Sequence, residues 1–174
     1  MRSLLLAAFA AASLVQVPAF AAADNTLIDY DGFARDVAAV RSSREGRRVA
    51  EQEFIRMASE SGTVVLDARS ERLFKLRHVK GAVNLSFPEF TRETLARVIP
   101  THATRVLIYC NNNFIGAPES MPTKALASAL NLSTFVALHT YGYRNVYELG
   151  PAIEVARSEL VFEGEETGSP PTRG

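Results

Sequence analysis

The chain has 174 residues, and its 19 basic and 19 acidic side chains give a formal net charge of zero at neutral pH. The absence of a broad positive field argues against nucleic acid or an anionic membrane as the main partner. The length suits one domain with one hydrophobic core. The single cysteine, Cys110, has no partner in the chain for a disulfide, so it is either a buried inert side chain or one kept for chemistry.

The first residues read as a secretory signal peptide. Arg2 precedes the apolar run LLLAAFAAASLV, and the following QVPAFA has the small residues that cleavage sites favour. The run is too short to span a bilayer as a helix, and no later segment is long and uncharged enough to do so. We therefore expect cleavage of residues 1–21 and an exported, periplasmic protein without a membrane span. An uncleaved anchoring helix is the alternative.

The two ends of the mature chain differ in composition from its middle. Residues 22–47 form an expected N-terminal extension, in which FARDVAAVR has helical spacing and RSSREGRR follows as a basic linker. The arginines of this linker form no regular stripe, so we interpret it as a solvated turn rather than an anion or partner site. We expect residues 159–174 to be a flexible tail, because EGEETGSPPTRG has acidic residues, glycine and proline but no apolar side chains.

Helical and strand patterns alternate across residues 48–158. Helices are predicted for AEQEFIRMAS, for PEFTRETLARVI opened by Pro88, and for LNLSTFVALHTYGY, which starts near Asn131 or Ser133 and ends near Gly142. Strands are predicted for TVVLDARS, GAVNLS, RVLIYC and NVYEL. This order predicts one α/β domain, a parallel sheet flanked by helices on both faces.

Cys110 ends the RVLIYC strand, and sites in parallel α/β sheets form where such strands end near helix N-termini. Backbone N–H groups aimed at the sulfur would stabilise a thiolate and lower the cysteine pKa. Asn111, Asn112 and Asn113 tolerate left-handed backbone geometry, which would let their amides form an anion-binding nest. The alternatives are an ordinary asparagine turn and a cysteine that is merely a core residue.

Four segments, VVLDARS, RHVKGAVNLSF, VLIYCNNN and YGYRNVYELGPAI, occur in the order and approximate spacing of single-domain rhodanese-like proteins. Asp67 and Arg69 match the Asp-x-Arg of that family, and Cys110 matches its active-site cysteine. The family's His-x-x-Gly-Ala-x-Asn segment is matched by His78, Gly81, Ala82 and Asn84. Residues 64–153 thus resemble a rhodanese-like domain, which implies the rhodanese-like fold and sulfur transfer without a cofactor.

In the implied reaction, the Cys110 thiolate attacks the outer sulfur of a small anionic donor such as thiosulfate and keeps that sulfur as a persulfide. A thiol or cyanide acceptor then removes it. The expected substrate-binding residues are Asn111, Asn112, Asn113, Phe114 and Lys124, of which Lys124 is the best local cation. Asp67, Arg69 and His78 are expected to be structural residues near the site.

Residues 111–132 depart from the family pattern. Typical members have a compact loop containing an arginine that leads directly into the next helix, whereas this longer segment contains none. Its TKALASAL portion is predicted to form a short helix capped by Thr123. The segment could be a lid over the sulfur, fill the pocket, or bind a protein partner. The alternative function is therefore a catalytically weak or silent rhodanese-like binding or sulfur-carrier module.

Two other kinds of chemistry are disfavoured. Phosphatase or arsenate-reductase chemistry needs an arginine soon after the cysteine to clamp an oxyanion, and the first one here is Arg144. His78, His102 and His139 lack metal-ligand spacing, so we expect no metal site.

Overall fold

The computed structural model describes residues 25–168. The expected signal peptide, residues 1–21, lies outside the described residues. Among the helices in the described range, none combines the length and the apolar character needed to cross a membrane.

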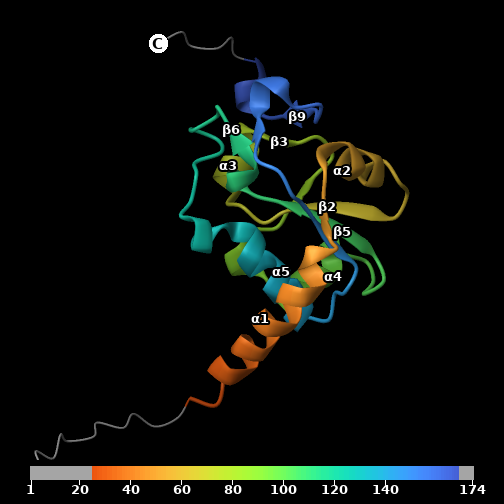
Figure 1. The fold of residues 1–174 in the computed structure, drawn as a ribbon, viewed down its shortest axis with the longest axis vertical. Coiled ribbons are helices and arrows are strands. Elements are labelled where there is room, and N and C mark those ends of the chain that lie inside the picture. The colour runs from red at the N-terminus through yellow and green to blue at the C-terminus, as the bar shows by residue number, and fades with distance from the viewer. Residues whose placement is uncertain (1–24, 169–174) are drawn as a thin grey trace, which may run out of the picture.

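A five-stranded, fully parallel sheet forms the centre of the domain (Figure 1). Its strands are β1 (Arg48–Val49), β2 (Thr63–Asp67), β4 (Val83–Asn84), β5 (Arg105–Tyr109) and β7 (Val146–Leu149), in the spatial order β1-β7-β5-β2-β4. Strand β5 is central, and its side chains are buried from Val106 onward, as its uninterrupted apolar run predicts. The expected parallel α/β sheet is confirmed.

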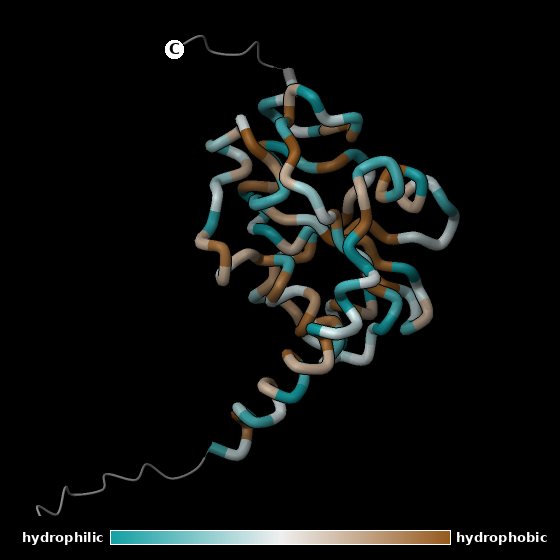
Figure 2. Tube along the Cα trace, viewed as in Figure 1, coloured by the Kyte–Doolittle hydropathy of each residue, from teal (hydrophilic) through white to brown (hydrophobic). Residues whose placement is uncertain are grey.

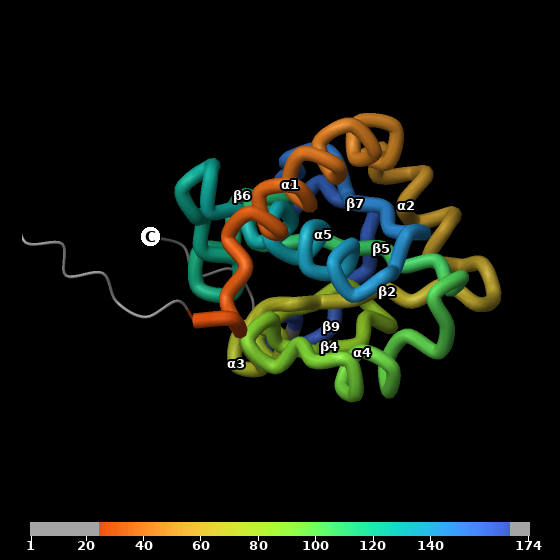
Figure 3. The backbone as a smooth tube through the Cα atoms, turned by 90° about the horizontal axis from the view of Figure 1, so that it is seen from below, coloured from red at the N-terminus to blue at the C-terminus, as the bar shows by residue number. Residues whose placement is uncertain are grey.

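Helices cover both faces of this sheet. The helices are α1 (Tyr30–Glu45), α2 (Glu51–Ala58), α3 (Glu71–Leu76), α4 (Arg92–Val98) and α5 (Leu130–Thr140). Side chains of α1, α4 and α5 pack on one face, which we call the α5 face, and those of α2 pack on the other, the α2 face. Figure 3 shows α1 lying beside α5. The Thr140 hydroxyl of α5 donates to Asp36 of α1 at 2.6 Å, which joins the extension to the domain.

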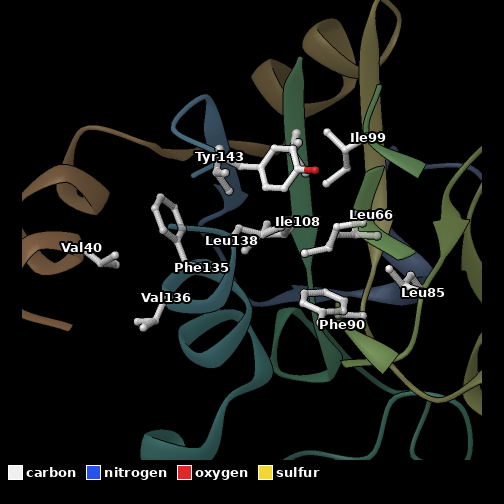
Figure 4. Close-up of a cluster of buried hydrophobic side chains, with 14 residues drawn as sticks. Val40, Leu66, Leu85, Phe90, Ile99, Ile108, Phe135, Val136, Leu138 and Tyr143 are labelled. Atoms are coloured by element: carbon white, nitrogen blue, oxygen red, sulfur yellow. The ribbon is translucent and has the colours of Figure 1, made fainter. Parts of the chain in front are cut away.

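Alternation along the strands divides the core into two clusters. Val106 and Ile108 point to the α5 face. Ile108 packs there with Phe135 and Leu138, together with Val40 from α1 (Figure 4). Leu107 and Tyr109 point to the α2 face. Among the described residues, many of the hydrophobic segments accordingly lie toward the centre of the domain (Figure 2). Because side chains of a strand alternate between its two faces, Cys110 shares the face of Ile108.

Short elements complete the fold. Two small sheets pair β3 (His78–Val79) with β9 (Phe162–Glu163), antiparallel, and β6 (Phe114–Ile115) with β8 (Ile153–Glu154), parallel. The 3-10 helices are η1 (Phe87–Glu89), η2 (Asn111–Asn113), η3 (Leu126–Ser128), η4 (Val155–Arg157) and η5 (Glu165–Gly168).

Residues 159–168, expected to belong to a flexible tail, are folded in the structure. Leu160 is buried, β9 pairs with β3, and Gly164 has a φ of 126° with an added Cβ only 2.5 Å from the carbonyl oxygen of Leu76. The expectation was wrong here because Leu160 and Phe162 supply apolar contacts that the acidic composition masked. Residues 169–174 lie outside the described part of the chain.

Three predicted helix boundaries differ from the structure. Helix α1 continues through RSSRE to Glu45, so most of the expected linker is helical. Helix α4 begins after Thr91 rather than at Pro88, because Thr91 and Thr94 form a reciprocal capping box. In TKALASAL only η3 forms, preceded by Ala125 without a side-chain cap.

Candidate functional site

Cys110 directly follows the central strand β5 and opens η2. Its side chain is only 2% exposed, yet it lines a cavity of about 190 Å³ on the α5 face. Other walls of this cavity come from α1, β1, β7 and the start of α5. The thiol thus borders a small pocket that is partly open to the surface.

Backbone N–H groups from two separate segments point at the Cys110 sulfur. Asn112 contributes from η2, and Leu130 and Asn131 contribute from the first turn of α5. The first four N–H groups of a helix have no partner within the helix, so they are available to an anion. The sequence analysis expected amides of the asparagine run and of a helix N-terminus here, but it did not identify Leu130 and Asn131. The expected left-handed nest is wrong, because residues 111–113 form the 3-10 helix η2 and none of them has a positive φ.

The net effect on the thiol differs from the expectation of a lowered pKa. Burial raises the pKa of the Cys110 thiol above its ordinary value of 9.0, and the N–H groups of Asn131, Asn112 and Leu130 offset this only in part. The nearby carboxylate of Glu148 raises the pKa of the thiol further. The net shift therefore favours the protonated thiol over the thiolate.

The side chain of Asn113 organises this corner of the fold. Its Oδ1 accepts the N–H of Cys110 at 2.9 Å and an amide hydrogen from Asn131 at 3.1 Å. Its Nδ2 donates to the carbonyl oxygens of Leu149 at 2.8 Å and Pro151 at 3.0 Å. One asparagine thus joins the end of β5, the start of α5 and the segment after β7.

The cations at the cavity are Arg44, near the end of α1, and Arg48 of β1. Arg44 Nη2 lies 2.5 Å from Oε1 of Glu148, and Arg48 Nε lies 3.2 Å from the same oxygen. These arginines belong to the RSSREGRR segment, which we interpreted as a solvated turn. That interpretation was wrong for Arg44 and Arg48, because the prolonged helix and the pairing of β1 with β7 bring them to the sheet edge.

A larger groove of about 600 Å³ runs between α1 and α5 beside the cavity. It shares Arg44, Arg48 and Leu132 with the cavity, and its other walls include the apolar side chains of Val37 and Val136. Groups larger than an inorganic anion therefore have space next to the cysteine.

Phe114 does not line the cavity, although it was predicted to bind substrate. It is buried on the α2 face, edge-on to Tyr109 and Phe162, because the pairing of β6 with β8 turns it away from Cys110. Ala117 and Met121 follow it into the same cluster. The first part of the 111–132 segment therefore packs on the α2 face, while Leu126 and Ala129 of its second part border the cavity.

Lys124 and Asn111 also lie apart from the cavity walls. The side chain of Asn112 holds the backbone of Lys124, donating to its carbonyl oxygen at 2.8 Å and accepting its N–H at 2.9 Å. Lys124 is exposed and forms no wall of the cavity, so the prediction of Lys124 as the substrate cation is not supported by its position. Asn111 is buried in η2.

Asp67 and Arg69, expected to be structural, lie with Tyr109 on the α2 face, and His78 lies in β3, outside the five-stranded sheet. Asp67 and Arg69 are buried in contact with each other, and Arg69 Nη1 donates to the carbonyl oxygen of Ser120 at 2.9 Å. His78 stacks on Phe74 with a centroid distance of 3.7 Å and forms no wall of the cavity. Within residues 25–168, no cluster of three or more potential metal-ligating side chains occurs.

A family model and one solved structure identify the fold. The family model described as "Rhodanese-like domain" matches residues 50–150, more than half of the chain. The solution structure of the rhodanese-like domain of an Anabaena protein superposes with a TM-score of 0.50 at 16% identity, covering 74% of this chain and 86% of that one. A Bacillus halodurans protein gives a TM-score of 0.49 at 18% identity, with coverages of 76% and 88%. A rhodanese from E. coli, solved with anions, gives 0.39 at 21% identity, with coverages of 59% and 99%. No curated protein matches the chain.

Proposed function

Because this chain belongs to the rhodanese-like domain family, we propose that it is a sulfurtransferase that carries a sulfane sulfur on Cys110. One observation carries the proposal: the only cysteine follows the central strand, with N–H groups from η2 and α5 directed at its sulfur inside a cavity. Such groups stabilise a sulfur anion at a strand end.

The reaction has two halves. The Cys110 sulfur forms a bond to the outer sulfur of thiosulfate, the sulfur–sulfur bond of thiosulfate breaks, and sulfite leaves with its electron pair. A thiol or cyanide then attacks the outer sulfur of the persulfide and restores the Cys110 thiolate. The N–H groups of Asn112 and Asn131 would stabilise the persulfide anion between the two halves.

The surroundings of the cavity favour a donor with an anionic group. Arg44 and Arg48 together carry one positive charge more than Glu148 balances, and they lie on the wall that separates the cavity from the larger groove. An organic persulfide could extend into this groove, while thiosulfate would fit within the cavity alone.

Mass spectrometry of the intact protein tests the proposal. Treatment with thiosulfate or glutathione persulfide should add the mass of one sulfur atom, cyanide should remove it, and Cys110→Ser should prevent it. A protein that gains no sulfur from either donor would contradict the proposed activity.

The second candidate function is a rhodanese-like sulfur-carrier or binding module without turnover of small donors. The near-complete burial of Cys110 and the raised pKa of its thiol favour this reading. A carrier would accept sulfur from a protein persulfide but not from thiosulfate, and its 111–132 segment would offer the contact surface. Comparing the initial rates with small and protein-bound donors separates the two functions.

We also propose that the protein acts in the periplasm after removal of residues 1–21. The support is the sequence pattern of this segment alone. N-terminal sequencing of protein recovered from a periplasmic fraction should begin near Ala22, whereas an intact Met1 in the cytosol would contradict export.

A further inference from the structure

Glu148 of β7 is a buried carboxylate in the wall of the cysteine cavity. Its side chain is 1% exposed, and both of its arginine partners bind the same oxygen, Oε1. The other oxygen, Oε2, is buried without a hydrogen-bond partner in the described part of the chain. A buried polar atom without a partner costs about 1–3 kcal/mol, so its retention points to a hydrogen that it accepts during function.

The sheet register places this carboxylate beside the thiol. Glu148 is the Cα partner of Ile108, and Cys110 lies two residues beyond Ile108 on the same face of the neighbouring strand. Adjacent strands are about 4.8 Å apart, which makes the two side chains diagonal neighbours. The cavity between them, about 190 Å³, has room for a relaying water molecule.

We propose that Glu148 accepts the proton of the Cys110 thiol, directly or through one water, during formation of the persulfide. The S–H bond breaks, its proton moves to Oε2, and its electron pair stays on sulfur to form the new sulfur–sulfur bond. The departing thiolate or sulfite leaves with the electron pair of the broken bond and can take the proton from Glu148. This role rests on the proposed sulfurtransferase function.

Arg44 and Arg48 are positioning residues in this scheme. By holding Oε1, they fix the carboxylate with Oε2 free and keep it ionised against the effect of burial. They are the charged groups that face the pair from α1 and β1, while α5 contributes Asn131 and Leu132, which do not titrate.

The electrostatics of the pair support proton sharing. Burial raises the pKa of the Glu148 carboxyl above 4.5, and burial together with the Glu148 charge raises that of the Cys110 thiol above 9.0. Two acidic groups in one poorly solvated site resist carrying two negative charges. A carboxylate whose pKa is raised toward neutrality is also the stronger base.

The test uses a reaction that needs no sulfur donor, the alkylation of Cys110 by iodoacetamide over a range of pH. In the wild-type protein the rate should rise in two steps, first as Glu148 ionises and then as the thiol ionises. Glu148→Gln should lack the first step and react about 10-fold or more slowly at neutral pH, because losing the proton acceptor outweighs the lower thiol pKa that follows from removing its charge. Above pH 9.0, the ordinary pKa of the thiol, this variant should react at least as fast as the wild type, because the repelling charge is gone.

The exposed Glu154 of β8 provides the matched control, and Glu154→Gln should keep both steps. A Glu148→Gln profile that is lowered by one constant factor at every pH, or not lowered at neutral pH, would overturn the proposal. Should Glu148→Gln fail to fold, Arg48→Met offers a second measurement, since Arg48 is half exposed. Removing it should move the first step to higher pH, and an unmoved step would overturn the proposal.

The same protein samples separate this inference from the proposed function. A two-step alkylation profile without sulfur uptake from any donor would support the proton transfer and reject the sulfurtransferase. Sulfur uptake together with parallel alkylation profiles for the wild type and Glu148→Gln would support the sulfurtransferase and reject the proton transfer.

Discussion

Arg69 lies against Asp67 with Nη2 2.5 Å from Oδ2, and both side chains are almost completely buried. The hydroxyl of Tyr109 donates to the same Oδ2 at 2.5 Å, and Arg69 Nη1 lies 2.8 Å from the sulfur of Met121. This contact network joins the adjacent strands β2 and β5 to the 111–132 segment, and it holds that segment on the α2 face.

Replacing Arg69 should therefore destabilise the fold strongly. Arg69→Met leaves the charge of Asp67 buried without a cationic partner, which we expect to lower the free energy of unfolding by about 3–5 kcal/mol. Urea denaturation measures this difference, with Arg157→Met at an exposed position as the control. A loss no larger than that of the control would mean that water solvates Asp67 in the native state.

The folded C-terminal segment leads to a second prediction. A Cβ on Gly164 would lie 2.5 Å from the Leu76 carbonyl oxygen, and the φ of 126° is a conformation that L-residues rarely adopt. Gly164→Ala should cost about 1–3 kcal/mol through this strain. Gly46→Ala is the matched control, because nothing lies within 4 Å of its added Cβ. Equal melting temperatures for the two variants would favour the flexible tail that the sequence suggested.

The sequence was most informative where a pattern is local. The apolar run before Cys110 is a buried strand because it is hydrophobic on both faces, and the alternation of strands and helices limits the topology to a parallel sheet. The family motifs around Asp67 and Cys110 could be placed at strand ends because each follows such an apolar run directly. These features needed no knowledge of long-range contacts.

The residues that line the cavity could not be predicted from local sequence patterns. Arg44 and Glu148 are far apart in the chain, and they meet only because β1 pairs with β7 at the edge of the sheet. The amides of Leu130 and Asn131 reach the sulfur only after the 111–132 segment has crossed to the α2 face and returned. The order of the basic segment was missed for the same reason, since α1 continues to Glu45 and β1 pairs with β7 only in the folded chain.

The raised pKa of Cys110 predicts how stability changes with pH. Above the ordinary cysteine pKa of 9.0, the unfolded chain loses the thiol proton while the folded protein keeps it. The native state then binds more protons, so stability falls as the pH rises from 9.0 toward the pKa of the folded state. Urea denaturation should show a steeper fall for the wild type than for Cys110→Ser over this range. Parallel curves would indicate a thiol with an ordinary pKa.

Substitutions of Arg48 and Lys124 should show which of these two positively charged side chains binds an anionic substrate. Arg48→Ala removes a positive charge from the cavity wall, so the KM for thiosulfate should rise about 10-fold, the effect of losing one charged hydrogen bond. Lys124→Ala should leave it unchanged, because only the backbone of Lys124 is held near the loop. The reverse order of effects in steady-state kinetics would restore Lys124 as the substrate cation.

Loss of Asn113 should affect both the reactivity of Cys110 and the stability of the fold. Because its Oδ1 accepts a hydrogen bond and its Nδ2 donates two, two different substitutions can be compared. Asn113→Ala removes the bonds to Cys110 N, Leu149 O and Pro151 O together, so about 1–3 kcal/mol of stability and the alignment of the amides should both be lost. Asn113→Asp keeps an acceptor for Cys110 N but loses both donated bonds to the carbonyl oxygens of Leu149 and Pro151. It also adds a negative charge near the sulfur, which should raise the thiol pKa further. Alkylation rates at neutral pH should therefore fall in both variants. Only the aspartate variant should recover toward the wild-type rate as the pH increases, and recovery of the alanine variant instead would show that the asparagine does not position the sulfur.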